Sequence, residues 1–372
     1  MNLDFTEEQD MLREMVQGMC AEFAPLDVVR TCEDDPKGYP DEFWKQLAEL
    51  DLLGLTIPEQ YGGSEQTMLE AAVVYEEFGR ALAPSPHFVS SILSAQALLK
   101  AGSEEQKQAW VTKIASGEAI LTPAWLEPDN GYGEKGVQLE AKAAGDDFVL
   151  TGVKRHVLFA SSATRLIVLA RTRDGVDLFL VDPNADGVTL TQLHSLAGDT
   201  QYRVDLAGVK VSAADRIGAA GSGWNTWNEV MHEGIILDAA YSIGSAQQSL
   251  DITAEFSKER EQFGKPLAAF QALSHYMADA AVCIDGGRVL MYEAAWAAAE
   301  GKSISRLAPM AKLFASNTYR DATVKFIQIW GGVGFTIEYD IQLYFRRGKQ
   351  SQMTWWDTRY LEELIAADVL DG

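Results

Sequence analysis

The feature that most constrains the fold is a set of three long stretches, in the C-terminal part of the chain, whose interiors lack proline. They cover residues 226–259, 273–300 and 303–330, with Pro266 between the first two and Pro309 near the start of the third. Proline is tolerated in the first turn of a helix, where its missing N–H would have no partner anyway. Stretches of this length without a heptad pattern predict long helices that pack together in a bundle.

Between residues 118 and 220 the apolar pattern changes to a period of two. Two of the apolar runs flank the dipeptide Asp174-Gly175, which is a common hairpin signal. Strands that follow one another through polar turns, with no helix between them, predict a compact β-domain. The expected strands include residues 148–150, 166–169, 178–181, 188–193 and 202–211.

The first 117 residues carry helix signals instead. Thr6 and Gln9 form a capping-box pattern, and Ser103 and Gln106 form another. We therefore expect an α+β protein with three domains. These are an N-terminal α-helical domain (1–117), a middle β-domain (118–220) and a C-terminal helical bundle (221–372).

Composition and charge exclude several classes of function. The 372 residues include 31 Lys and Arg against 54 Asp and Glu, which gives a formal net charge of −23. This charge argues against binding to nucleic acid or to an anionic membrane surface. No apolar run is long enough to span a bilayer, and the N-terminus lacks a secretory signal pattern. The three cysteines lack metal-ligand spacing, so we expect a cytoplasmic protein without a metal site.

Four segments, at residues 5–9, 44–63, 260–272 and 328–347, carry motifs that occur together in one enzyme family. The third segment begins R-E-Q-F-G-K-P, and the fourth contains G-G-V-G. In this order and spacing they resemble the acyl-CoA dehydrogenases, FAD enzymes that desaturate acyl-CoA thioesters at Cα–Cβ. The resemblance covers essentially the whole chain. It implies a helical N-terminal domain, a β-barrel-like middle domain and a C-terminal four-helix bundle, usually in a tetramer.

The resemblance also implies which residues hold the cofactor. In the family, an arginine, a glutamine and a glycine loop hold the ADP portion of FAD across a subunit interface. Arginine can pair with a pyrophosphate at two points, and glycines let backbone N–H groups approach phosphate. Without the resemblance, these residues would be interpreted as a solvated charge and a helix end. Carried over, the cofactor-binding residues are Arg260, Phe263, Gln271, Gln328, Gly331, Gly332 and Gly334.

The chain departs from the family in the segments that meet the flavin ring. Where the family has T-E-P, this chain has Leu126-Glu127-Pro128, and where the family has W-I-T-N, residues 156–159 read H-V-L-F. The resemblance then implies backbone and apolar contacts to the flavin. It also points to a divergent bacterial branch that acts on bulky or dicarboxylic acyl groups, including steroid side chains.

A larger departure concerns the catalytic base. Desaturation needs a carboxylate that removes the Cα proton while a hydride leaves Cβ for flavin N5. The two positions at which the family carries that glutamate correspond to Trp355 and Gly234, and neither is acidic. Asp238, one helical turn after Gly234, is our candidate base, and Glu233 is a second candidate. Asp238 has an alternative interpretation as a buried carboxylate satisfied by its neighbours. Trp355 is our candidate substrate-binding residue, which would shape or fill the acyl pocket, and its alternative is ordinary packing beneath the C-terminal helix.

Three functions remain open at this point. The first is an FAD-dependent acyl-CoA dehydrogenase that uses Asp238 and passes its electrons to electron-transferring flavoprotein. The second is the base-less partner subunit of a heteromeric acyl-CoA dehydrogenase. The third is redox-neutral elimination on a CoA thioester. The first and third are compatible with a homo-oligomer, and the second requires a hetero-oligomer with a homologous subunit.

Overall fold

The computed structural model describes residues 4–371, which divide into two units. Among the described residues, the helical unit comprises 4–29, 67–83 and 235–371, and the sheet unit comprises 30–66 and 84–234. The chain passes from one unit to the other at four points: within α2 (Leu26–Thr31), before residue 67, after residue 83 and within α8 (Gly223–Glu259). The division into three domains stays a prediction.

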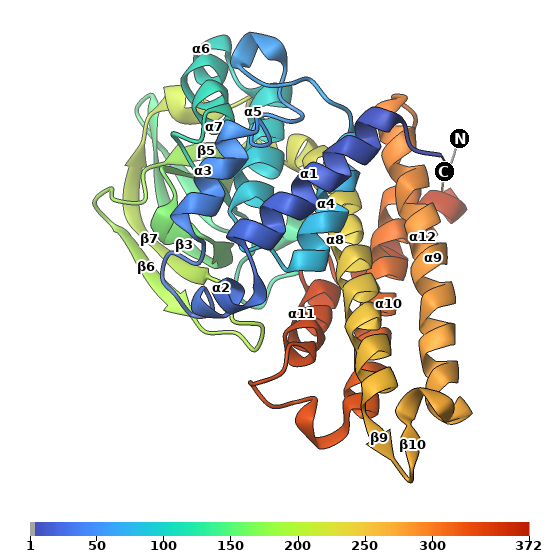
Figure 1. Cartoon of the computed structure of the whole chain (residues 1–372). Coiled ribbons are helices and arrows are strands. Elements are labelled where there is room, and N and C mark those ends of the chain that lie inside the picture. Colours follow the sequence, from blue (N-terminus) through green and yellow to red (C-terminus); the bar gives the residue numbers. More distant parts are fainter. Residues whose placement is uncertain (1–3, 372) are drawn as a thin grey trace. The chain divides into compact units, whose positions relative to one another are not determined.

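The helical unit is built from long helices, and Figure 1 shows α8, α9 and α10 running side by side. The three long helices expected from the sequence are confirmed. Because α10 begins at Leu307, Pro309 lies in its first turn, as expected. A short hairpin of β9 (Glu261–Gln262) and β10 (Lys265–Pro266) joins α8 to α9. The helices are α1 (Glu7–Phe23), α4 (Met68–Ala81), α8, α9 (Gln271–Ala299), α10 (Leu307–Trp330), α11 (Ile341–Met353) and α12 (Thr358–Asp371).

Helices α4 and α8 cross at two glycines. A Cβ atom on Gly244 would lie 1.8 Å from the carbonyl oxygen of Glu76, and one on Gly79 would lie 2.0 Å from that of Tyr241. Ser245 Oγ donates a hydrogen bond of 2.8 Å to Gly79 O across the same crossing. The backbones therefore approach more closely than any residue with a side chain would allow, and this contact fixes the position of α8.

The sheet unit contains an eight-stranded sheet in the order β6-β7-β3-β2-β4-β5-β8, with β1 beside β4. The expected hairpin at Asp174-Gly175 is confirmed, since β4 and β5 pair antiparallel around it. The parallel pairing of β1 with β4 was not predicted from the sequence. The strands are β1 (Leu121–Ala124), β2 (Glu140–Ala144), β3 (Asp147–Leu158), β4 (Arg165–Thr172), β5 (Gly175–Val181), β6 (Val188–Leu193), β7 (Gln201–Val211) and β8 (Arg216–Ile217).

Short helices complete the sheet unit. They are α3 (Asp41–Glu49), α5 (Ala95–Ala101), α6 (Glu104–Gln106) and α7 (Thr112–Ala115). Two π-helical turns lie next to these helices: Phe88–Ser94 directly precedes α5, and Lys107–Val111 joins α6 to α7. The apolar pattern of the sequence did not indicate either turn. The capping boxes at Thr6 and Ser103 are both formed.

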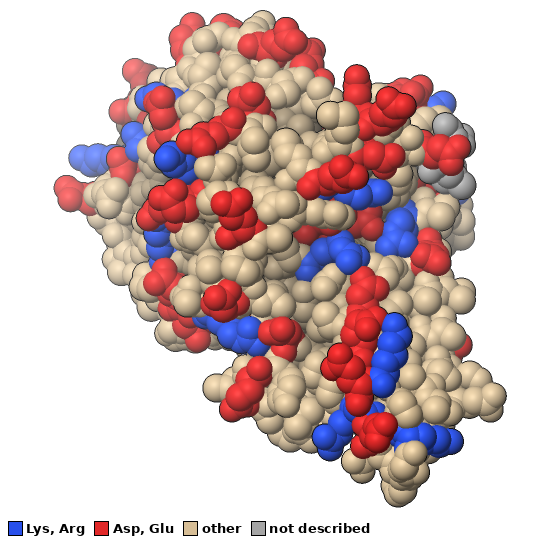
Figure 2. All heavy atoms as spheres, in the orientation of Figure 1, with Lys and Arg blue, Asp and Glu red and all other residues tan. Residues whose placement is uncertain are grey.

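The surface carries the expected excess of acidic side chains. Figure 2 shows Asp and Glu spread over the face in view, with Lys and Arg interspersed among them. Within residues 4–371, no helix is both long enough and apolar enough to cross a membrane.

Candidate functional site

Asp238, the candidate base, lies on α8 and forms an ion pair with Lys312 of α10. The Lys312 side chain is completely buried, and that of Asp238 is 13% exposed. Burial raises the pKa of the Asp238 carboxyl, and the nearby Lys312 ammonium acts in the opposite direction. The environment is thus as desolvated as the sequence predicted, but the carboxylate already has a cationic partner.

Further hydrogen bonds connect this ion pair to α11. Lys312 Nζ donates a bond of 2.6 Å to the carbonyl oxygen of Ser351. Ser242 Oγ lies 2.6 Å from Ser351 Oγ and donates 2.9 Å to the backbone oxygen of Asp238. Burial, and secondly the charge of Asp238, raise the pKa of the Tyr75 phenol well above its ordinary value. Three helices therefore converge on one buried polar cluster, formed by Asp238, Lys312, Ser242 and Ser351.

Sequence reasoning missed Lys312. The residue stands on the buried face of α10, where Ala308, Ala311 and Ala315 are also completely buried. A lysine at this spacing on an otherwise apolar face was the available signal, because buried lysines require a partner.

The first family base position, Trp355, lies in an unusual turn after α11. Trp355 and Trp356 follow the C-cap residue Thr354 and have φ angles of 50° and 75°. Left-handed backbone is uncommon for bulky residues, so two in succession form a specific local structure. The Trp356 side chain is completely buried, whereas Trp355 is half-buried.

Beside the second family base position, Gly234, the end of the Leu93 side chain occupies the space next to the backbone. A Cβ atom there would lie 2.6 Å from Leu93 Cδ2 and 3.5 Å from Phe88 Cζ. Both residues belong to the π-helical turn at Phe88–Ser94. The adjacent Glu233 is bound by Lys100, whose Nζ donates 2.8 Å to its carboxylate. Apolar side chains therefore occupy the space that a catalytic glutamate would need.

The residues predicted to hold FAD come from two segments of the helical unit. Arg260 and Phe263 lie in the connection between α8 and α9, and Gln271 is the first residue of α9. Gln328 lies in the last turn of α10, and the three glycines follow that helix. The indole of Trp330 stacks on Phe256 with ring centroids 3.9 Å apart and donates 3.1 Å to Thr253 Oγ1. This contact joins the last turns of α8 and α10, and so brings the two segments to the same end of the bundle.

The chemistry of these residues fits the ADP portion of FAD. Phe263 is 94% exposed, and Arg260, Gln271 and Gln328 are exposed as well. A Cβ atom on Gly331 or Gly332 would meet nothing within 4 Å, so the backbone there is open to a ligand. Gly334 differs, because its Cβ would lie 2.7 Å from Trp330 Cβ, and this glycine therefore serves packing. An exposed guanidinium, two amides and an open glycine backbone suit a pyrophosphate and an adenosine.

The segment that replaces T-E-P is organised around a buried ion pair in the sheet unit. Lys154 Nζ donates 2.6 Å to Glu127 Oε1, and the two side chains are 0% and 6% exposed. Burial lowers the pKa of Lys154 to about 8, although Glu127 opposes the shift. The Glu127 carboxylate also accepts backbone N–H bonds from Gln138 and Leu139, each at 2.9 Å. The glutamate therefore fixes the loop that follows Pro128.

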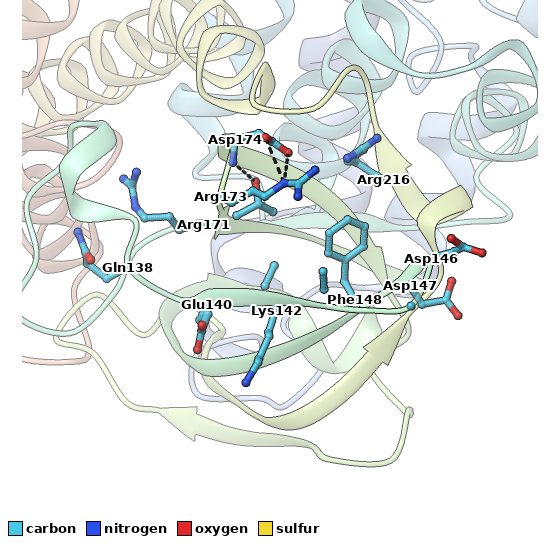
Figure 3. A pocket seen from close by; sticks show the side chains of 14 residues that line it. Gln138, Glu140, Lys142, Asp146, Asp147, Phe148, Arg171, Arg173, Asp174 and Arg216 are labelled. Atoms are coloured by element: carbon cyan, nitrogen blue, oxygen red, sulfur yellow. Dashed lines mark hydrogen bonds and ion pairs between the residues drawn. The ribbon is translucent and has the colours of Figure 1, made fainter.

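A separate hollow of about 790 Å³ opens between the β2–β3 and β4–β5 hairpins (Figure 3). Its lining mixes both charges, with Phe148 in the middle and Arg216 5.8 Å from the Phe148 ring centroid. Arg171 is already used, because its Nε donates 2.8 Å to Val137 O. None of the residues predicted for the active site lines this hollow.

Comparison with known proteins gives a match along nearly the whole chain. The sequence profiles of the N-terminal, middle and C-terminal domains of acyl-CoA dehydrogenase match residues 6–118, 123–209 and 221–355. A probable acyl-CoA dehydrogenase of Bacillus subtilis, YngJ, is 34% identical over 94% of each chain.

Two solved structures with similar folds are relevant to the site. The structure described as the ChsE4-ChsE5 complex from Mycobacterium tuberculosis matches with a TM-score of 0.91 at 27% identity over 100% of both chains. A structure of a variant of the steroid ACAD designated Tcur3481-Tcur3483 matches with a TM-score of 0.87 at 30% identity, over 98% of this chain and 99% of that one.

Proposed function

Because the chain belongs to the acyl-CoA dehydrogenase family, we propose that it acts in the FAD-dependent α,β-desaturation of an acyl-CoA thioester as a subunit without a catalytic base of its own. A homologous subunit would supply the carboxylate that removes the Cα proton. The family consists of oxidoreductases that use FAD and act on acyl-CoA. When bound, FAD supplies the acceptor for the hydride that leaves Cβ.

The observation that carries this proposal is the ion pair between Asp238 and Lys312. A general base must be within reach of the substrate proton and free to accept it. To act as one, Asp238 would have to give up its partner and leave a fully buried ammonium unpaired, which costs several kcal/mol. The ion pair therefore favours the alternative interpretation of Asp238 as a buried carboxylate satisfied within the protein.

The two family base positions support the same proposal. Trp355 has no titratable group, and Leu93 and Phe88 fill the space beside Gly234. Glu233 is engaged by Lys100. Each carboxylate considered from the sequence is thus either absent or already paired.

This chain's own contribution would be to bind the ADP portion of FAD at Arg260, Gln271 and the Gly331–Gly332 backbone. These groups are exposed at one end of the bundle, which suits a cofactor shared with a second subunit. Among the similar structures, one is described as a complex of two proteins and another as a steroid enzyme with a paired designation. We therefore propose a hetero-oligomer and a bulky acyl group, with electron-transferring flavoprotein as the electron acceptor.

Isolation of the native complex tests the proposed function. We expect the chain to co-purify with a homologue that carries a glutamate at one of the two family positions. Glu→Gln in that homologue should lower acyl-CoA oxidation by about 10²–10⁴-fold, as expected for loss of a general base. Glu233→Gln in this chain is the matched control and should leave the rate unchanged. A native homo-oligomer that oxidises acyl-CoA would contradict the proposal.

A further inference from the structure

We propose that Lys312, held by Asp238, is a positioning residue that fixes the end of α11 and, through it, the turn at Trp355 and Trp356. The inference deepens the proposed function and rests on it in one respect: the turn occupies the place of the loop that carries the catalytic glutamate elsewhere in the family. In this chain the buried carboxylate would thus hold a structural cation in place.

The Lys312 ammonium lies at the C-terminal end of α11. Its Nζ donates 2.6 Å to the carbonyl oxygen of Ser351, which lies in the last turn of α11. The last carbonyl groups of a helix have no partners within that helix and carry partial negative charge. A buried cation at this point therefore satisfies an acceptor and stabilises the C-terminal end of α11.

Asp238 offsets the cost of burying the Lys312 ammonium. Burying an ammonium group costs free energy unless an opposite charge offsets its desolvation. Asp238 supplies that charge, and Ser242 links the backbone of Asp238 to Ser351 Oγ. The four residues connect α8, α10 and α11 through side-chain and backbone groups at once. Removing the carboxylate or the ammonium should therefore have different effects.

The end of α11 continues directly into the turn at Trp355 and Trp356. The Thr354 N–H donates 3.0 Å to Gln350 O, and the next two residues have left-handed backbone. Such backbone persists for bulky residues only where the surroundings determine it. Trp356 is held on the far side, completely buried and 5.4 Å from the Tyr360 ring centroid. Trp355 is thus placed between two fixed points, the end of α11 and the buried side chain of Trp356. Lys312 stabilises the first of these.

Three variants of the full chain test this role: Lys312→Met, Asp238→Asn, and the two combined. The measurement is amide hydrogen exchange across residues 350–357, together with urea unfolding. Lys312→Met should raise local exchange roughly 10- to 100-fold, the equivalent of one lost hydrogen bond from a charged group. Asp238→Asn should lower resistance to urea, because the buried ammonium loses its counter-charge. It should largely preserve protection across residues 350–357, because the asparagine oxygen still accepts from Lys312.

The double variant separates positioning from simple charge balance. It leaves no unpaired charge in the interior, so its resistance to urea should recover relative to Lys312→Met. Its exchange across residues 350–357 should remain fast, because Ser351 O still lacks the cation. Normal protection in Lys312→Met, or full recovery of protection in the double variant, would overturn the proposal.

A spectroscopic measurement gives an independent readout. Trp355→Phe in the wild-type chain should remove a near-ultraviolet circular dichroism band, because a fixed indole contributes one. The same substitution in the double variant should change the spectrum little, because Trp355 is no longer held there. An equal loss of signal in both backgrounds would contradict the role of Lys312. These experiments use neither acyl-CoA nor a second subunit, so their outcome is independent of the proposed function.

Discussion

Glu127→Ala should lower the free energy of unfolding by about 3–5 kcal/mol at pH 7, the cost of leaving a buried charge without its partner. Lys154 would remain completely buried without its carboxylate, and the N–H groups of Gln138 and Leu139 would lose their acceptor. Urea unfolding followed by circular dichroism measures the change. The loop after Pro128, which Glu127 anchors through these N–H groups, should become mobile as well.

Two variants serve as controls for this prediction. Glu140→Ala removes an exposed carboxylate from β2 and should change stability by less than about 0.5 kcal/mol. Glu127→Ala combined with Lys154→Met removes both charges and should recover much of the loss. If Glu127→Ala is as stable as the wild type, the ion pair does not support this segment.

The pKa of Lys154 gives the same pair a distinctive pH dependence. Burial lowers this pKa from 10.5 to about 8, so between these values the unfolded chain binds more protons than the folded chain. Stability therefore rises with pH across this window, by at most about 3 kcal/mol. Below pH 8 the cost of the buried ammonium is fully present. Lys154→Met should abolish the rise, and an unchanged pH profile would contradict the assignment.

Gly244→Ala should lower the free energy of unfolding by roughly 3 kcal/mol, about as much as Glu127→Ala, because the new side chain forces two packed helices apart. The new Cβ would lie 1.8 Å from Glu76 O, and backbone atoms cannot move aside as a flexible side chain can. Thermal unfolding measures the effect. Because α8 carries Asp238 three residues before Tyr241, this variant should also disturb the buried cluster.

Gly286→Ala is the matched control, since both glycines lie inside long helices. A Cβ on Gly286 would meet only Phe314 ring atoms at 4.0 Å. Alanine there should stabilise α9 by roughly 0.5–1 kcal/mol, because glycine loses more freedom on folding. Opposite signs for the two variants support the close crossing of α4 and α8. Equal effects would indicate that helix propensity alone is responsible.

Much of the fold follows from local signals in the sequence. The lengths of the long helices could be predicted because proline residues lie near their ends. The capping boxes at Thr6 and Ser103 form as predicted. The pairing of β1 with β4 could not be predicted, because it joins segments far apart in the chain and depends on their register. The π-helical turn at Phe88–Ser94 has no distinct apolar period, so it was missed as well.

The site was predictable only in part. The absence of an acidic residue at positions 234 and 355 is visible in the sequence, and so is the apolar surrounding of Asp238. The partner of Asp238 is not, because Lys312 lies on another helix and their contact depends on how α8 and α10 pack. The left-handed turn at Trp355 could not be anticipated either, since such backbone is rare for tryptophan.

The central claim is that this chain contains no catalytic base of its own. The most direct test is the visible flavin spectrum of the chain expressed alone and loaded with FAD, recorded without oxygen before and after addition of a panel of acyl-CoA thioesters. Our account predicts that the oxidised flavin band persists with every thioester and bleaches only when the glutamate-bearing homologue is added. Bleaching of the flavin in the chain alone, abolished by Asp238→Asn, would contradict it.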